Sequence, residues 1–561
     1  MHEQLIANRL ESLHIPSTVD VETYNNLLHF YEDSIQRFKE RPAYSSLGRT
    51  ITFAELDYFA DAFAHYLQNE TSLQVGDRIA IQLPNIIQSP VAFLGSLRAG
   101  LIIVNVNPLY TATELEHQFN DSGAKALIVL ANIADTVAKV IDKTAIETVI
   151  VTELADLHRS PKRQLLNFAI KHIKKMVPEF SFTQSVKFTD VMKLSSGKKP
   201  RVVSAQLTDT AVLQYTGGTT GVAKGAMLTH GNILANMIQA APIFDTYGLS
   251  DQGDTLVQPL PLYHIYAFTV GLIILAKGAH TVLIPNPRDL PALVKELKNW
   301  TIHGFCGLNT LFIALCNNHE FQKLDFSQLK LTLSGGMALT SYAADLWKQT
   351  TGKDIYEGYG LTETSPVVSV NSGNGMRAGT IGVPLPLTQV DIRDDEGNSL
   401  ELGESGELCV KGPQVMKGYW QREEATKESI IDGWFYTGDI AILDDDGYLT
   451  IVDRKKDMIL TSGFNVYPNE IEDVICKHDA ILEACAIGAP DERSGEVVHV
   501  YAVKTSKDDQ VQEKELITFC REYLAAYKVP KKIIFKDELP KTNVGKILRR
   551  EVRDNALHEG N

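Results

Sequence analysis

Cysteine is scarce in this chain. The six cysteines among 561 residues are far apart, with no CxxC pair and no histidine at metal-ligand spacing. Such a pattern favours core or surface thiols in a reducing cytoplasmic compartment over a disulfide framework. They are Cys306, Cys316, Cys409, Cys476, Cys485 and Cys520.

Long unbroken apolar runs are also missing. The two longest, "SPVAFLGSLRAGLIIVNVNP" and "IYAFTVGLIILAKGAH", are interrupted by Arg98 and Lys277, so we expect no transmembrane helix. The first residues, "MHEQLIANRLESLH", mix acidic and basic side chains and lack the apolar core of a signal peptide. We therefore expect a cytoplasmic protein.

An excess of basic residues is absent as well. The formal net charge of -15 argues against a general nucleic-acid binder, which needs a basic field toward the phosphate backbone. Any anionic ligand must then be held by local cations. The length is too great for one core and predicts at least two globular domains. An oligomer is compatible with the sequence.

From residue 78 onward, apolar strand-like runs alternate with helix-length segments. This alternation is typical of parallel strands that helices bury on both faces. A second series begins at residue 211, and together the two series predict an α/β body with two related sheets. The strand-like runs are 78–83, 101–106, 125–130, 147–152, 211–215, 280–285 and 330–336.

The pattern changes near residue 381. Short strands separated by "DDEGN", "LGESGE" and "DDDGY" predict a small antiparallel β subdomain over 381–452. Beyond it, helices and strands alternate over a length suited to a separate α+β domain. We expect a large N-terminal domain, 1–453, and a smaller, mobile C-terminal domain, 454–561.

The segment "YTGGTTGVAKGAMLTH", 215–230, places glycines, threonines and one lysine before a helical pattern. Glycines let backbone N–H groups approach a phosphate, threonine hydroxyls add donors or contacts to Mg²⁺, and lysine adds positive charge. The segment is not a Walker A loop, because Lys224 lies between Ala223 and Gly225. A tight structural turn explains the same residues equally well.

Five further motifs follow in order: "YEGYGLTETSP", "GWFYTGD", "DRKKDMI", "SGFNVYPNEIE" and "PKTNVGKILRR". With the glycine-threonine loop, this set resembles the acyl-adenylate-forming superfamily of acyl-CoA synthetases, luciferases and peptide-synthetase adenylation domains. The resemblance extends from Thr52 to Arg550. Within the superfamily, "VNVNPLY", "LPLYHIYAF" and "GELCVKGPQVMKGYWQR" are similar to the bacterial long-chain fatty-acid CoA ligases.

The resemblance implies a two-step reaction. A fatty carboxylate attacks the α-phosphate of Mg-ATP to give acyl-AMP and pyrophosphate, and the thiol of coenzyme A then displaces AMP. The activation is chemically sensible, because AMP leaves far more readily than a carboxylate oxygen.

The resemblance assigns the phosphates and the metal ion to the first two motifs. Lys224 would hold pyrophosphate as it leaves, and Thr362 would contact phosphate. Thr216 and Glu363 would contact Mg²⁺, which prefers oxygen ligands. A solvated lysine and a helix N-cap are the structural alternatives. The implied loop residues are Tyr215, Thr216, Gly217, Gly218, Thr219, Thr220, Gly221 and Lys224.

The nucleoside would lie against the later motifs. The resemblance implies that Tyr359 packs on adenine, that Asp439 accepts hydrogen bonds from the ribose hydroxyls, and that Arg454 approaches the ribose or phosphate. Read without the family, Asp439 is simply a turn residue. Backbone close to the nucleotide would come from Gly335, Gly336 and Gly360.

Lys546 resembles the catalytic lysine of the C-terminal domain, which bridges carboxylate and α-phosphate as negative charge builds. A basic surface run, with Arg549 and Arg550, is the alternative reading. Because Lys546 and the ATP loop belong to different domains, the domains would close for the first step and rearrange for the second about a hinge at 453–456. Ser462, Gly463 and Phe464 would then line the coenzyme A channel.

Two residues of "PLYHIYAF" are candidates for the acyl side. His264 is where the family places a residue beside the acyl carboxylate, and Phe268 is where related enzymes place an aromatic gate. Core packing explains both residues equally well.

The segment 159–178 has an amphipathic pattern. Leu166, Ile170, Ile173 and Val177 fall on one helical face and cations lie opposite and on the flanks, which suits an anionic membrane surface. We expect this segment to contact the cytoplasmic face of the inner membrane. A helix packed on the protein body is the alternative.

Two rival functions remain beside the long-chain fatty-acid ligase. One is an acyl-AMP ligase that loads a carrier protein, although no carrier domain is evident. The other is an inactive membrane-associated fatty-acid binder, which the joint presence of Lys224, Glu363, Asp439 and Lys546 disfavours.

Overall fold

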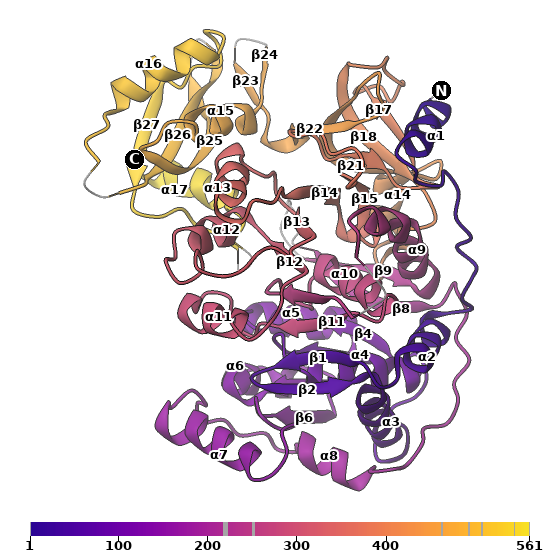
Figure 1. The fold of residues 1–561 in the computed structure, drawn as a ribbon. Helices are drawn as coiled ribbons and strands as arrows, with labels where there is room; N and C mark the ends of the chain where they lie inside the picture. Colours follow the sequence, from indigo (N-terminus) through magenta and orange to yellow (C-terminus); the bar gives the residue numbers. More distant parts are fainter. Residues whose placement is uncertain are drawn as a thin grey trace.

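The computed structural model describes residues 2–216, 223–249, 253–461, 464–491, 494–506, 509–542 and 545–559. Within this part of the chain four β-sheets organise the fold, and helices pack against them (Figure 1). Two sheets form the body of the large domain, a third forms a β subdomain, and the fourth belongs to the C-terminal domain. The expected α/β class with a smaller C-terminal domain is confirmed.

The larger body sheet has nine strands. Its centre, from β1 to β14, is parallel, and antiparallel strands close both edges. Three adjacent strands of this parallel centre, β12, β13 and β14, each end in a glycine. In spatial order the strands are β16 (Val383–Pro384), β15 (Val367–Val370), β14 (Tyr356–Gly360), β13 (Leu331–Gly335), β12 (Gly304–Gly307), β10 (Thr255–Gln258), β11 (His280–Leu283), β1 (Pro42–Ser46) and β2 (Arg49–Thr52).

The second body sheet has eight strands. The run 211–215, which the sequence pattern groups with the second series, pairs in parallel with β4 and so belongs to the sheet of the first series. Chain order alone does not determine which strands become neighbours. In spatial order the strands are β19 (Gly418–Tyr419), β9 (Lys224–Thr229), β8 (Thr210–Thr216), β4 (Ile102–Asn105), β3 (Arg78–Gln82), β5 (Ala124–Leu130), β6 (Thr148–Thr152) and β7 (Val186–Lys187).

The helices of the large domain cover these sheets, and capping residues determine where several of them begin. At the start of α9, for example, Thr229 and Asn232 form a reciprocal capping box. The described helices of this domain are α1 (Glu3–Ser12), α2 (Leu27–Phe38), α3 (Phe53–Asn69), α4 (Gln88–Arg98), α5 (Ala112–Ser122), α6 (Ala134–Ala138), α7 (Lys162–Phe168), α8 (Phe188–Leu194), α9 (His230–Thr246), α10 (Ile265–Ala276), α11 (Leu290–Leu297), α12 (Asn309–Cys316), α13 (Ser341–Thr351) and α14 (Glu423–Ser429).

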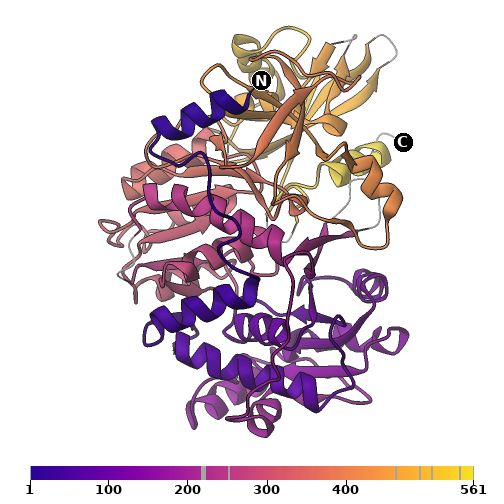
Figure 2. The ribbon, with the colours of Figure 1, turned by 90° about the vertical axis from the view of Figure 1, so that its right-hand side faces the viewer.

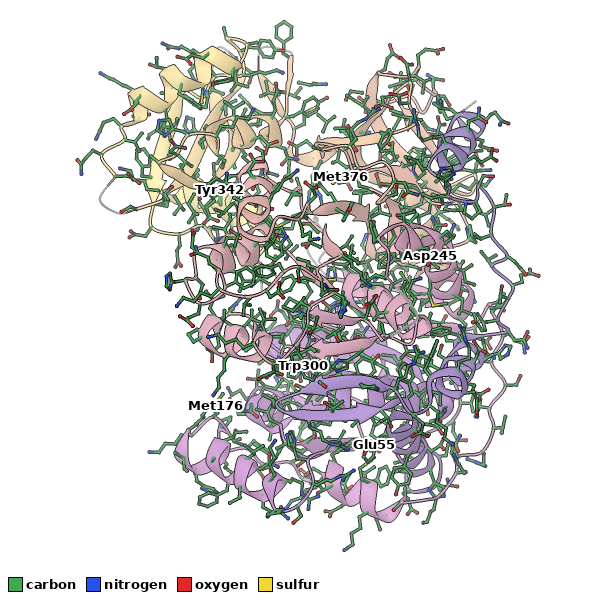
Figure 3. All side chains as sticks on the ribbon, viewed as in Figure 1. Glu55, Met176, Asp245, Trp300, Tyr342 and Met376 are labelled. Atoms are coloured by element: carbon green, nitrogen blue, oxygen red, sulfur yellow. The ribbon has the colours of Figure 1, made fainter. Side chains whose placement is uncertain are left out.

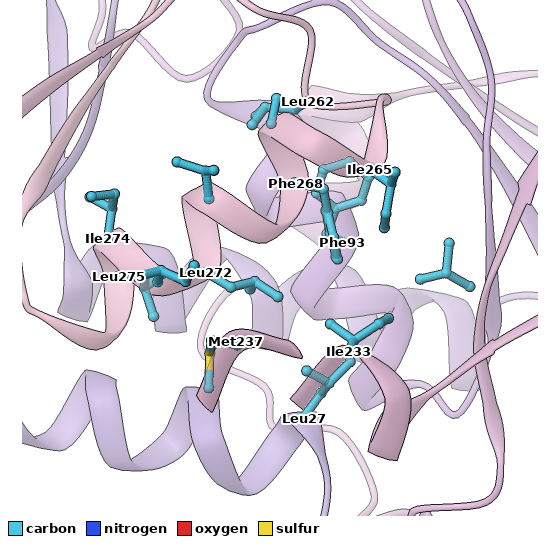
Figure 4. Packing of buried hydrophobic residues seen from close by; sticks show 14 of the residues in the cluster. Leu27, Phe93, Ile233, Met237, Leu262, Ile265, Phe268, Leu272, Ile274 and Leu275 are labelled. Atoms are coloured by element: carbon cyan, nitrogen blue, oxygen red, sulfur yellow. The ribbon is translucent and has the colours of Figure 1, made fainter. Parts of the chain in front are cut away.

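The main core lies where α2, α4, α9 and α10 meet, and Figure 4 shows part of it. The buried rings of Phe93 on α4 and Phe268 on α10 meet edge to face, with centroids 5.3 Å apart. Met237 and Leu272 continue this apolar layer beside them. Burial of such a large apolar cluster is the main stabilising contribution in this domain.

The β subdomain consists mainly of hairpins. Its strands are β17 (Gln389–Arg393), β18 (Ser405–Lys411), β21 (Trp434–Leu443), β20 (Ile430–Ile431) and β22 (Leu449–Arg454). Helix α1 lies against it (Figure 2), where Arg9 forms an ion pair of 2.6 Å with Asp446. The first helix of the chain therefore packs on a segment more than 400 residues away.

The C-terminal domain has its own apolar clusters, which begin at Ile459. Helices α15 (Pro468–Ile475), α16 (Glu513–Tyr523) and α17 (Arg549–Glu559) accompany its sheet. The boundary at 453 and 454 stays a prediction. The strands of this sheet are β24 (Phe464–Val466), β23 (Ile459–Thr461), β26 (Gly495–Lys504), β25 (Ile481–Asp491) and β27 (Lys532–Lys536).

The amphipathic pattern over 159–178 predicts a longer helix than the structure contains. The helix consists of α7 and a single π-helical segment, Ala169–Ile173. Leu166, Ile170 and Val177 are half-buried, whereas Ile173 is exposed. Within the described residues, no helix combines the length and the apolar character needed to cross a bilayer.

Candidate active site

Strands β8 and β9 hold the two ends of the glycine-threonine loop together. They pair antiparallel, with Thr216 opposite Lys224 at the open end. The loop residues Gly217, Gly218, Thr219, Thr220 and Gly221 lie outside the described residues. The side chain of Tyr215 leaves the loop and donates a hydrogen bond of 2.7 Å to Asp121 on α5, so this hydroxyl anchors the strand end.

Lys224 lies over an aromatic ring. Its Nζ is 5.2 Å from the ring centroid of Tyr419 on β19, within the range of a cation–π contact. The hydroxyl of Tyr419 donates a hydrogen bond of 2.8 Å to Oε1 of Glu363. The lysine expected to hold phosphate and the carboxylate expected to hold Mg²⁺ are therefore joined through one tyrosine.

Glu363 is almost fully buried, at 7 % exposure. It lies in a 3₁₀ turn, Thr362–Thr364, directly after β14. Burial raises the pKa of Glu363, and the hydrogen bond from Tyr419 opposes that rise. Thr362 lies in the same turn and is half-buried.

The structure is compatible with a magnesium ion that is held mainly by substrate. Among the described residues, no three His, Cys, Asp or Glu side chains are grouped for a metal ion. Mg²⁺ commonly takes one or two protein oxygens and completes its shell with phosphate oxygens and water. One carboxylate, Glu363, and one hydroxyl, Thr216, fit that pattern.

A second cluster surrounds Asp439 in the β subdomain. Its Oδ2 accepts a hydrogen bond of 2.6 Å from the hydroxyl of Tyr359 on β14, and its Oδ1 lies 3.2 Å from Nε of Arg454. Asp439 and Arg454 are register partners on β21 and β22. Three residues predicted from separate motifs are therefore in contact.

Three glycines are predicted to lie close to the nucleotide. They differ in how much space a side chain would have at each position. A Cβ at Gly360 would lie 2.1 Å from the carbonyl oxygen of Pro366, so this position excludes any larger residue. Gly335 ends β13 opposite Gly358. Gly336 has φ +86° and faces open space, which leaves its backbone accessible to a ligand.

His264 is the N-cap of α10, and its Nδ1 accepts a hydrogen bond from the backbone N–H of Tyr266. Burial, with a smaller contribution from Lys546, lowers the pKa of His264 to about 4. The imidazole is therefore neutral at pH 7. The role of His264 beside the acyl carboxylate stays a prediction.

Lys546 reaches the large domain from the loop before α17. Removal from water and the nearby Arg454 lower the pKa of Lys546 to about 8, whereas Asp439 raises it. A Cβ at Gly545 would lie 2.8 Å from Oγ1 of Thr310 on α12, so the lysine loop and α12 are in close contact. Lys546 is thus close enough to Arg454, Asp439 and His264 for electrostatic interaction.

The predicted hinge is anchored on both sides. Asp453 is 1 % exposed, and its Oδ2 accepts a hydrogen bond of 2.8 Å from the backbone N–H of Asn469 on α15. Arg549 on α17 lies 2.7 Å from Glu472 and 3.3 Å from Asp457. These contacts join the hinge to the helix that follows Lys546.

The residues predicted for coenzyme A are only partly described. Ser462 and Gly463 lie outside the described residues. Phe464 is 56 % exposed, and its ring stacks on Tyr527 with centroids 4.8 Å apart. Two aromatic faces are therefore available on this side of the C-terminal domain.

Sequence reasoning missed Tyr419 and Thr310. Tyr419 belongs to "KGYWQR", which carried part of the resemblance but received no role. Its position between Lys224 and Glu363 depends on pairing between β19 and β9, which a single sequence does not reveal. Thr310 has no distinguishing pattern, since it lies in an ordinary apolar helix.

Comparison with known proteins identifies the relatives of the chain. Residues 31–420 match the model of the AMP-binding enzyme family, and residues 470–546 match that of the AMP-binding enzyme C-terminal domain. Long-chain-fatty-acid–CoA ligase from Escherichia coli O157:H7 is 50 % identical over 97 % of this chain and 96 % of its own length. The ligase of that name from Bacillus subtilis is 38 % identical over 93 % and 92 %.

Solved structures share the fold. ATP-bound MatB from Rhodopseudomonas palustris aligns with a TM-score of 0.79 and 28 % identity, over 94 % of this chain and 99 % of that chain. The anthranilate CoA ligase AuaEII, in complex with anthranoyl-AMP, aligns with a TM-score of 0.85 and 24 % identity, over 97 % and 100 %. The chain therefore belongs to the AMP-binding enzyme family and, within it, to the group of the bacterial long-chain fatty-acid CoA ligases.

Proposed function

We propose that this protein activates long-chain fatty acids in an ATP-dependent reaction that passes through acyl-AMP and yields acyl-CoA, AMP and pyrophosphate. The observation that carries the proposal is the contact between Tyr359, Asp439 and Arg454, with Lys546 of the C-terminal domain close enough to Asp439 and Arg454 for their charges to shift its pKa. The 50 % identity to the ligase from Escherichia coli supports the substrate class.

In the first step, a carboxylate oxygen of the fatty acid bonds to the α-phosphorus of ATP, and the bond to pyrophosphate breaks. Lys546 carries positive charge to the point where both reacting groups are anionic, and Lys224 stabilises the departing pyrophosphate. Fixed cations in a site shielded from water stabilise such charge strongly. Glu363 and Thr216 would hold Mg²⁺, which supplies further charge neutralisation at the phosphate oxygens.

Asp439 and Tyr359 orient the nucleoside. The carboxylate of Asp439 already accepts one hydrogen bond, and its remaining lone pairs suit two ribose hydroxyls. Neutral His264 offers a hydrogen bond beside the acyl carboxylate without adding charge. In the second step, the thiolate of coenzyme A bonds to the acyl carbon, and the bond to AMP breaks.

The order of the two steps requires a change of domain arrangement. Lys546 would act on the reacting groups in the present arrangement, so coenzyme A would approach after the C-terminal domain has turned about 453–456. Phe464 and the neighbouring segment would then line the entry of the pantetheine arm. Ser462 and Gly463 are proposed for the same channel.

We also propose that the protein docks on the cytoplasmic face of an anionic membrane. The segment from α7 to Met176 exposes four apolar side chains: Leu165 at 66 %, Phe168 at 59 %, Ile173 at 71 % and Met176 at 50 %. Lysines 162, 171, 174 and 175 are exposed around them. This segment lies at the end of the molecule opposite the C-terminal domain, where Figure 3 labels Met176.

Product identification tests the function. The purified protein is incubated with Mg-ATP and fatty acids of increasing length, with and without coenzyme A, and the products are identified by mass spectrometry. We expect acyl-CoA only when coenzyme A is present, with the highest yield for long chains. Acyl-AMP that accumulates while coenzyme A stays unchanged would instead identify a carrier-loading ligase, and no product at all would identify an inactive binding protein.

A further inference from the structure

Tyr419 occupies a rigid position between two chain segments. Its strand, β19, pairs antiparallel with β9, the strand that begins at Lys224. The backbone N–H of Trp420 donates a hydrogen bond of 2.8 Å to Gly225, and that of Lys417 donates one of 3.0 Å to Met227. The tyrosine is therefore fixed relative to Lys224 by the sheet itself.

The same segment is also attached to the turn that carries Glu363. The backbone N–H of Met416 donates a hydrogen bond of 2.8 Å to the carbonyl oxygen of Glu363. Asn232, in the capping box of α9, donates to the carbonyl oxygens of Pro413 and Val415, each at 2.9 Å. The segment 413–420 thus connects β9, α9 and the Glu363 turn.

The side chain of Tyr419 contacts Glu363 and Lys224 in different ways. Its hydroxyl donates to Oε1 of Glu363 at 2.8 Å, and its ring face lies 5.2 Å from Nζ of Lys224. Tyr419 itself is 8 % exposed. Both contacts are therefore made away from bulk water, where charge-assisted hydrogen bonds and cation–π contacts are strongest.

The direction of the hydrogen bond follows from the groups present. A carboxylate oxygen only accepts, so the hydroxyl of Tyr419 is the donor in this pair. The hydrogen bond therefore restricts where the carboxylate of Glu363 can lie.

We propose that Tyr419 is a positioning residue that holds the cation-binding carboxylate of Glu363 and the phosphate-binding ammonium of Lys224 at a fixed separation. The inference rests on the proposed roles of Glu363 and Lys224. The hydroxyl acts on the carboxylate and the ring acts on the lysine. Substitutions can therefore separate the two effects.

Tyr419→Phe removes only the hydroxyl, whereas Tyr419→Leu removes the hydroxyl and the ring face. ATP binding is measured by calorimetry without fatty acid, so that no reaction occurs, once in excess Mg²⁺ and once in EDTA. We expect Tyr419→Phe to weaken binding about tenfold in Mg²⁺ and to leave binding in EDTA unchanged. Tyr419→Leu is expected to weaken binding in both conditions.

Tyr448→Phe is the matched control. Tyr448 is also buried, at 5 % exposure, and its hydroxyl makes one hydrogen bond, of 2.8 Å, to Gly375 near α1. We expect Tyr448→Phe to leave the affinity for ATP unchanged, both in Mg²⁺ and in EDTA. Circular dichroism of each variant monitors folding.

The outcomes separate this inference from the proposed function. If the wild type binds ATP equally in Mg²⁺ and EDTA, the proposed metal role of Glu363 fails. If the wild type depends on Mg²⁺ but Tyr419→Phe behaves as the wild type, or loses affinity equally in both conditions, the positioning role of Tyr419 is overturned. Recovery of Tyr419→Phe at higher Mg²⁺ concentration supports it.

Discussion

Lys546 combines two properties that oppose each other. The proposed mechanism needs its ammonium as a positive charge among anionic reactants, yet burial and Arg454 disfavour that charge and lower its pKa to about 8. A lysine in this situation loses its proton within the range where most proteins are stable. The charge that the proposed first step needs is therefore sensitive to pH.

The pH dependence of acyl-AMP formation follows from this pKa. As the pH rises through about 8, Lys546 becomes neutral, so we expect the rate of acyl-AMP formation to fall. His264 does not contribute to this fall in rate, because its pKa is about 4 and the imidazole is neutral throughout the measured range. The rate is measured in single turnovers from pH 6.5 to 9.5.

Lys546→Arg provides the control for this profile, since arginine keeps its charge up to about pH 12. We expect a lower rate at pH 7, because the guanidinium has a different shape, but no decline between pH 7.5 and 9. A decline that persists unchanged in Lys546→Arg would show that another group is responsible.

Among the helical elements, the one that ends at Ile173 has an unusual surface. A helix packed on the protein body should bury its apolar side chains, and Leu166 and Ile170 do so in part. Leu165, Phe168 and Ile173 instead face solvent beside lysines. Apolar side chains surrounded by cations are typical of helices that lie in the interface of anionic membranes.

Membrane binding by this element is tested with the double variant Phe168→Ser and Ile173→Ser. We expect co-sedimentation with vesicles that contain phosphatidylglycerol to fall at least fivefold, because both side chains lose their apolar contact with lipid. Val75→Ser is the control, since Val75 is 67 % exposed in another part of the chain. Equal binding by all three proteins would contradict the proposed docking surface.

The elements themselves were largely predictable from sequence. Apolar runs such as 125–130 became strands, and Thr229 and Asn232 begin α9 as local capping chemistry requires. The pairing of β8 with β4 was not predictable, because neighbours in a sheet depend on the whole topology. The pattern at 159–178 predicted a longer helix, because periodicity does not reveal the π segment or the break that follows it.

For the site, the motifs predicted the residues but not their contacts. Asp439, Arg454 and Tyr359 come from separate motifs and meet through pairing of β21 with β22 and the position of β14. Tyr419 was not predicted, because its role depends on its contacts with Lys224 and Glu363. A role that belongs to a motif can be predicted from sequence. A role that depends on contacts between distant segments requires the structure.

For the whole molecule, the account depends on Lys546 acting from one domain on substrates bound to the other. The most direct test compares the two half-reactions in Lys546→Ala. Fatty-acid-dependent exchange of labelled pyrophosphate into ATP reports the first step without coenzyme A. Conversion of supplied acyl-AMP to acyl-CoA reports the second.

Lys541→Ala is the control for the loop, because Lys541 forms an ion pair of 2.7 Å with Glu483 within the C-terminal domain. We expect Lys546→Ala to lower exchange by roughly 10²- to 10³-fold and to leave the second half-reaction within about twofold of the wild type. Lys541→Ala should retain both activities. Full exchange activity in Lys546→Ala, or an equal loss in both half-reactions, would contradict the account.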